Sequence, residues 1–170
     1  MKPIKKIIGS VAMFTALSTG VNAQSTATAS TTAVLVTPIA ISKTTDLHFG
    51  TVAASATAGT VVLDYADTRT TTGGVTLPAG STTQKTAVFA VTGEGTSTFS
   101  ISIPSAPITL TGSVSGSMTV GSFVADLGAT GTLVAGAKNI KVKATLNVGA
   151  GQVAGTYTNA SDLFVTVNYN

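Results

Sequence analysis

The sequence predicts an all-β protein with an immunoglobulin-like β-sandwich fold. Thr accounts for 30 of the residues in 24–170, and only 9% of the whole chain is charged. Glu, Gln, Arg and Leu, which favour helices, are scarce, whereas Thr and Val favour strands. Short apolar runs with alternating polar residues are separated by Gly and Pro, a pattern typical of antiparallel strands joined by turns.

Residues 1–23 have the pattern of a secretory signal peptide. Lys2, Lys5 and Lys6 precede an apolar run over residues 7–17, which is too short to span a bilayer, and a V-x-A cleavage motif ends at Ala23. We therefore expect an exported protein that passes through the periplasm to the cell surface or the extracellular space.

The net charge of the chain depends on this segment. The whole chain has nine Lys+Arg and six Asp+Glu, whereas residues 24–170 have six of each and are neutral. Nucleic-acid binding needs an excess of cations, so no nucleic-acid partner is expected, and no segment after the signal is apolar enough for a stable membrane span. Because cysteine is absent, packing and strand pairing must hold the domain together without disulfides.

Residues 24–37 are predicted to be an N-terminal extension, and residues 38–170 a single β-sandwich domain. Residues 33–36 and 39–41 have the pattern of a strand interrupted by Pro38, which suggests either an edge strand or a bend. Two interpretations of the extension stay open, a disordered leader and a donor strand that completes another chain. The candidate donor face consists of Ala27, Ala29, Thr31, Ala33 and Leu35.

The first half of the domain begins with a strand over residues 46–52. Alternation places Leu47 and Phe49 on one side and His48 on the other, and Gly50 marks a bend. The elements predicted after it are strands over residues 60–65, 85–92 and 98–103, a loop over residues 66–84, and a hairpin turn at residues 93–95 that joins the last two strands.

The second half ends in a hydrophobic strand over residues 163–169. Short strand pieces at residues 108–110 and 118–120 and a longer strand at 139–148 precede it. Because the chain ends inside an apolar strand, we expect this strand to lie deep in a sheet. Its apolar face, a candidate assembly or chaperone-binding strand, consists of Leu163, Val165, Val167 and Tyr169.

The sequence shows no pattern of an active site, so we predict no enzyme, cofactor or metal. The single histidine, His48, is expected at the surface, with no partner supplied by sequence spacing. Asp64 and Asp67 could share a calcium ion, but an oxygen-rich calcium loop is missing, and a solvated strand end is favoured. The sequon at Asn159 is short enough to arise by chance.

Several stretches carry motifs of a known family, namely residues 46–52, 59–61, 73–75, 142–148, 155–157 and 165–170. In these motifs the chain resembles the DUF4402 domain, a family of exported bacterial proteins of unknown function. The resemblance covers essentially all of residues 24–170. The family label implies export and assigns no activity.

The layout is more distantly similar to the pilins of archaic chaperone-usher fimbriae and to spore coat U-like domains. Leu47, Phe49 and Gly50 match their early strand, and Gly155, Tyr157, Val165, Val167 and Tyr169 match their C-terminal signature. The resemblance implies a sandwich that lacks its last strand. A periplasmic chaperone, and later the extension of a neighbouring subunit, would supply that strand. Archaic pilins commonly carry a disulfide, and this chain departs from them in having no cysteine.

The sequence is therefore compatible with two functions. The first is a structural subunit of a fimbria-like or other cell-surface polymer, assembled by donor-strand complementation. Its partners would be copies of itself or related subunits, with a periplasmic chaperone and an outer-membrane usher. The alternative is a stand-alone secreted adhesion or binding module of unknown ligand.

Overall fold

The computed structural model describes residues 24–80 and 82–170, and the predicted signal peptide lies outside this range. All regular elements in the described residues are β-strands, so the chain folds as the predicted β-sandwich. No helix capable of crossing a membrane occurs in this part of the chain. Residues 24–38 are exposed and contain no strand. The strand predicted around Pro38 is therefore absent from residues 33–36 and begins only after the proline, at Ala40.

The larger layer of the domain is an eight-stranded antiparallel sheet. Two of its strands, β2 and β3, lie off the main order, with β2 pairing to both β9 and β3. The main order is β1 (Ala40–Thr45), β4 (Ala87–Thr92), β9 (Ala137–Val148), β7 (Ser117–Ala125), β6 (Ile108–Gly112) and β10 (Tyr157–Thr158), and the branch is β2 (Gly59–Leu63) and β3 (Arg69–Gly73).

The twelve-residue strand β9 is the centre of this sheet. Its first half pairs with β4 and its second half with β2, while β7 pairs along its other edge. Every second residue from Ile140 to Val148 is buried, as the strand period of two requires. The alternation predicted for residues 139–148 therefore identifies the central strand.

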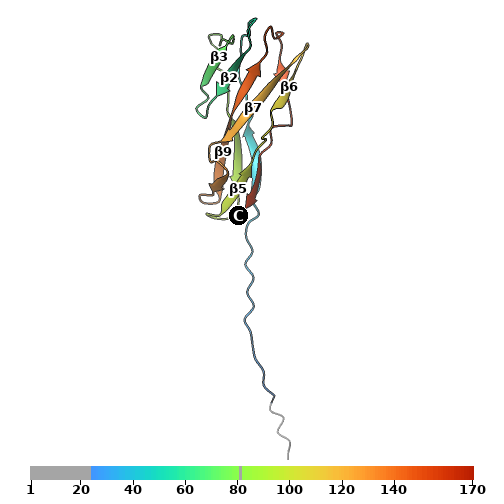
Figure 1. Cartoon of the computed structure of the whole chain (residues 1–170). Helices are drawn as coiled ribbons and strands as arrows, with labels where there is room; N and C mark the ends of the chain where they lie inside the picture. Colours follow the sequence, from blue (N-terminus) through green and yellow to red (C-terminus); the bar gives the residue numbers. More distant parts are fainter. Residues whose placement is uncertain (1–23, 81) are drawn as a thin grey trace, which may run out of the picture. The chain divides into compact units, whose positions relative to one another are not determined.

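The smaller layer has only three strands, in the order β11 (Thr166–Tyr169), β5 (Thr98–Ser102) and β8 (Thr130–Thr132). Figure 1 shows β5 at the end of the domain where the C-terminus lies. Phe99 on β5 is fully buried and faces Gly131 on β8, where a Cβ atom would collide with its ring. The small sheet thus depends on one large aromatic residue packed against a glycine.

The two sheets differ greatly in length. At about 3.3 Å per residue, β9 spans about 40 Å, whereas the five residues of β5 span about 17 Å. The small sheet is therefore too short to cover the whole inner face of the large one. Some apolar side chains of the large sheet therefore have no side chains of the small sheet packed against them.

Four expectations from the sequence are corrected by the strand pairing. The strands β4 and β5 belong to different sheets, so residues 85–103 form no hairpin, because the connection crosses between the layers. The segment predicted as a loop contains β3. The closing strand is shorter than predicted, and β11 lies at an edge of the small sheet instead of deep in it, because it pairs with β5 alone among the described strands.

We predict that Phe99→Ala destabilises the chain of residues 24–170 by about 3–5 kcal/mol, because it leaves a large cavity in the core. Urea denaturation followed by circular dichroism measures the loss. The neighbouring exposed residue provides the control, and Thr98→Ala should change the free energy of unfolding by less than about 0.5 kcal/mol. A Phe99→Ala loss similar to that of the control would show that the small sheet adds little to the core.

Candidate functional site

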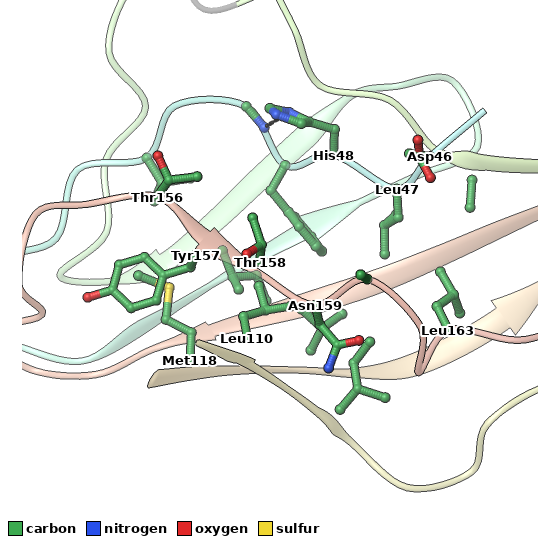
Figure 2. A pocket seen from close by; sticks show the side chains of 18 of the residues that line it. Asp46, Leu47, His48, Leu110, Met118, Thr156, Tyr157, Thr158, Asn159 and Leu163 are labelled. Atoms are coloured by element: carbon green, nitrogen blue, oxygen red, sulfur yellow. Dashed lines mark hydrogen bonds between the residues drawn. The ribbon is translucent and has the colours of Figure 1, made fainter. Parts of the chain in front are cut away.

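A groove of about 510 Å³ lies on the part of the large sheet that the small sheet does not cover. Two segments border it, residues 43–52, here called the first lip, and residues 155–163, the second lip. Figure 2 shows Leu47 and Leu163 directed into the groove from the two lips, and Leu110 and Met118 rising from its floor. The His48 ring points away from it (Figure 2).

The floor of the groove is apolar and comes from four strands of the large sheet. Val120 and Leu146 are buried, but Ile108, Leu110 and Met118 are only partly buried. Burial of such side chains is the main source of folding and association free energy, so a partly covered row of them favours an apolar occupant. The floor residues are Ala87 and Phe89 from β4, Ile108 and Leu110 from β6, Met118 and Val120 from β7, and Leu146 from β9.

The first lip is tied to its surroundings by main-chain hydrogen bonds. His48 and Lys85 exchange both N–H to C=O bonds at 2.8 Å. The Nη1 atom of Arg69 donates to the carbonyl oxygens of Phe49 at 2.7 Å and Thr51 at 2.9 Å. β1 ends at Thr45, and these bonds hold residues 46–52 in place with only an isolated bridge at His48. The strand predicted over residues 46–52 is therefore wrong, because this segment has no neighbouring strand to form a ladder with.

The bend in the first lip has a local cause. Gly50 adopts a φ of +71°, which glycine tolerates and other residues rarely adopt, and its N–H donates to Nδ1 of His48 at 2.9 Å. The bend predicted at Gly50 is confirmed, as are the inward directions of Leu47 and Phe49 and the exposed position of His48. The histidine thus supports the bend of the lip.

The second lip contains β10, which pairs with β6, and side-chain hydrogen bonds hold the residues around it. Asn159 donates through Nδ2 to the carbonyl of Thr109 on β6 at 2.9 Å, and its Oδ1 accepts from the N–H of Asp162 at 2.9 Å. The Tyr157 hydroxyl donates to the carbonyl of Val153 at 2.6 Å. The asparagine of the sequon motif therefore anchors the second lip to the large sheet.

The second lip of the groove leads along the chain into an edge strand. Leu163 ends the second lip, and three residues later β11 begins. In an antiparallel ladder, alternate residues bond to the partner strand, so every second residue of β11 turns its main-chain groups to the side away from β5. An unpaired edge beside an apolar groove is the arrangement to which an added strand binds.

One of the four residues of the predicted assembly strand lies at the groove. Leu163 lines the groove, whereas Val165 and Val167 are buried in the core and Tyr169 lies at the far end of β11, half-buried. All four residues are at least partly buried, and of the four only Leu163 lines the groove. The five candidate donor residues, from Ala27 to Leu35, are all exposed.

Asp64 and Asp67 have main-chain partners. Oδ1 of Asp64 accepts from the N–H groups of Ala66 and Thr68, both at 2.9 Å. Oδ1 of Asp67 accepts from the N–H of Thr86 at 2.7 Å. Within residues 24–80 and 82–170, no group of three or more acidic or histidine residues is arranged to hold a metal ion. The two aspartates therefore shape the turn that follows β2.

Sequence reasoning did not identify the floor of the groove. Ile108, Leu110 and Met118 lie on short segments that read as minor strand pieces, and nothing in their spacing shows that they stay uncovered. The one available signal was the shortness of the strands that form the small sheet. Whether a strand lies opposite another depends on contacts between distant segments, which a local pattern does not contain.

Comparison with known families gives one result. The family model described as Domain of unknown function (DUF4402) matches residues 39–169. No curated protein and no solved structure matches the chain.

We predict that Asp67 makes the stability of the domain depend on pH. The hydrogen bond from the N–H of Thr86, and next the ion pair with Lys85 at 2.9 Å, lower the pKa of Asp67 below its usual 3.8. A carboxylate with a lowered pKa stabilises the fold above its unfolded pKa, and this contribution is lost as pH falls through the folded pKa.

Asp67→Asn tests this directly. Asp67 has a φ of +62°, which asparagine also tolerates, so the variant removes the charge with little backbone strain. The wild type should melt at a higher temperature than the variant at pH 7, and the difference should shrink as the pH falls below about 4. A melting difference that stays constant from pH 7 to pH 3 would contradict the prediction.

Proposed function

The chain belongs to the DUF4402 family, and we propose that it is a structural subunit of a fimbria-like or other cell-surface polymer, assembled by donor-strand complementation. The donor is the N-terminal extension of one copy, residues 24–37, and the acceptor is the groove of the next copy. In this proposal the predicted signal peptide directs export, and the subunits meet after secretion.

The observation that supports this proposal is the partly covered apolar groove, whose second lip leads into β11, a strand that pairs with β5 alone among the described strands. The same chain carries the complementary element, because Leu35 and Val36 in the extension are 94% and 57% exposed. Exposed apolar side chains in the extension of one copy can be buried in the exposed apolar groove of another copy, and this burial favours association. Each burial of a side chain of the size of Leu contributes about 1.5–3 kcal/mol.

The dimensions of the two elements are compatible. The nine residues from Ala27 to Leu35 span about 30 Å when extended, and the two lips contain ten and nine residues. The bulky residues of the acceptor lie in the floor, so small donor side chains such as Ala29 and Ala33 let the two backbones approach closely. Main-chain hydrogen bonds to the edge of β11 would add affinity that does not depend on donor side chains.

Such an interface is heterologous, because the donor and acceptor surfaces differ. Repetition of a heterologous contact that does not close into a ring gives an open filament. A subunit with an open groove would also need a temporary cover during export. A periplasmic chaperone strand in the groove and an outer-membrane usher at the exit would supply this cover and the site of exchange. Neighbouring genes for these two partners would favour the proposal.

The proposal is tested with two complementary variants of residues 24–170, refolded alone and together. Leu35→Asp places a charge on the donor and leaves the groove intact. Leu110→Arg fills the groove and leaves the donor intact. Because either change buries a charge at the interface, each variant alone should lose at least tenfold in association and remain monomeric. Their mixture should form one-to-one dimers, measured by size-exclusion chromatography with light scattering.

Thr111→Arg is the matched control, because Thr111 is exposed and follows Leu110 on β6, on the opposite face of the sheet. This variant should form oligomers as the wild type does. Thermal unfolding of every variant checks that the fold is retained. A wild type that stays monomeric, or variants that oligomerise normally, would overturn the proposal and favour the secreted binding module.

A further inference from the structure

Glu94 and Tyr169 meet at the last residue of the extension, Thr37. The Tyr169 hydroxyl donates to the carbonyl of Thr37 at 2.8 Å, and the Glu94 carboxylate accepts from the N–H of Thr37 at 2.9 Å. The same tyrosine oxygen accepts from the N–H of Glu94 at 2.6 Å. The three hydrogen bonds close a ring, here called the Thr37 clamp, which joins positions 132 residues apart in sequence.

The residues around the clamp are shaped for it. A Cβ atom at Gly93 would collide with the Tyr169 hydroxyl, so glycine is required there. The hydrogen bond from the N–H of Thr37 lowers the pKa of Glu94, which keeps the carboxylate ionised as an acceptor. Val36 borders a small hollow beside Glu94 and Tyr169. The clamp accounts for Gly93, Glu94 and Tyr169.

The groove of the same chain begins only six residues after Thr37, at Lys43. The extension could therefore enter its own groove only if the chain reversed direction near Pro38. Proline favours such a reversal at the second position of a turn, which closes with a hydrogen bond from Ala40 N–H to the carbonyl of Thr37. In the structure residues 37–39 contain no turn, and the clamp holds Thr37 in this arrangement through both of its main-chain groups, the carbonyl bonded to Tyr169 and the N–H to Glu94.

We infer that the Thr37 clamp prevents the extension from filling the groove of its own chain and so reserves that groove for the extension of a second copy. This inference rests on the proposed strand donation. It assigns Glu94 and Tyr169 a positioning role, since neither residue lines the groove. Polymer growth then requires the clamp because a self-filled subunit can neither donate nor accept.

A disulfide trap tests the inference, since the chain has no cysteine to interfere. Ala29→Cys on the donor face and Ser161→Cys on the second lip are introduced together into residues 24–170. Oxidation after refolding should give disulfides between copies, seen as a ladder on a non-reducing gel. Adding Tyr169→Phe or Glu94→Ala should shift the product toward an internally bridged monomer.

The expected shift in the ratio of monomer to ladder is about fivefold for each clamp hydrogen bond removed. Tyr169→Phe removes two bonds and keeps the ring, so it should act more strongly than Glu94→Ala, which removes one. Ser97→Ala at the same end of the domain is the control and should leave the ratio unchanged. Thermal unfolding checks that each variant is folded. If Tyr169→Phe does not fold, Glu94→Ala still tests the inference, because Glu94 lies in a surface turn.

The outcomes separate the inference from the function on which it rests. Absence of any disulfide between residues 29 and 161 would overturn the proposed strand donation, and the inference with it. A ladder that persists in both clamp variants, with the monomer ratio of the control, would overturn the clamp inference alone. A shift toward bridged monomer in both variants supports it.

Discussion

The pairing of β9 along its whole length determines how the domain is built. Because β9 bonds to β4 and β2 on one edge and β7 on the other, the large sheet extends well past the three short strands that face it. The buried residues of β9 belong to the core. One of them, Leu146, also forms the floor of the groove together with residues of β4, β6 and β7. The groove thus results from unequal strand lengths in the two layers.

The lips of the groove follow from the same inequality. After β1 ends, the first lip is held by Arg69 and by the bridge between His48 and Lys85, and the second lip is held by the short pairing of β10 with β6 and by Asn159. No ladder joins the two lips to each other among the described strands, so they border the floor without closing over it. An added strand would find its side-chain contacts on the floor and its main-chain partners at the edge of β11.

The sequence predicts the local features of this structure and not the layer in which each strand lies. Alternation identifies β2, β4, β5 and β9, and the directions of Leu47, His48 and Phe49, because these depend on which side chains face water. It misses β3, whose threonines resemble a loop. The predicted hairpin fails because a turn at residues 93–95 serves equally well for a crossing between sheets. The edge position of β11 and the clamp on Thr37 depend on partners far away in sequence, which no local pattern contains.

The Thr37 clamp also has a mechanical consequence. In the proposed filament, tension along the axis enters each subunit through the extension, just before Thr37. Without the clamp that pull would reach β1 first, and an edge strand paired only with β4 could be peeled away one hydrogen bond at a time. The clamp passes part of the load to Glu94, after β4, and to Tyr169 at the end of β11. Force is then shared by both sheets and loads several bonds in parallel.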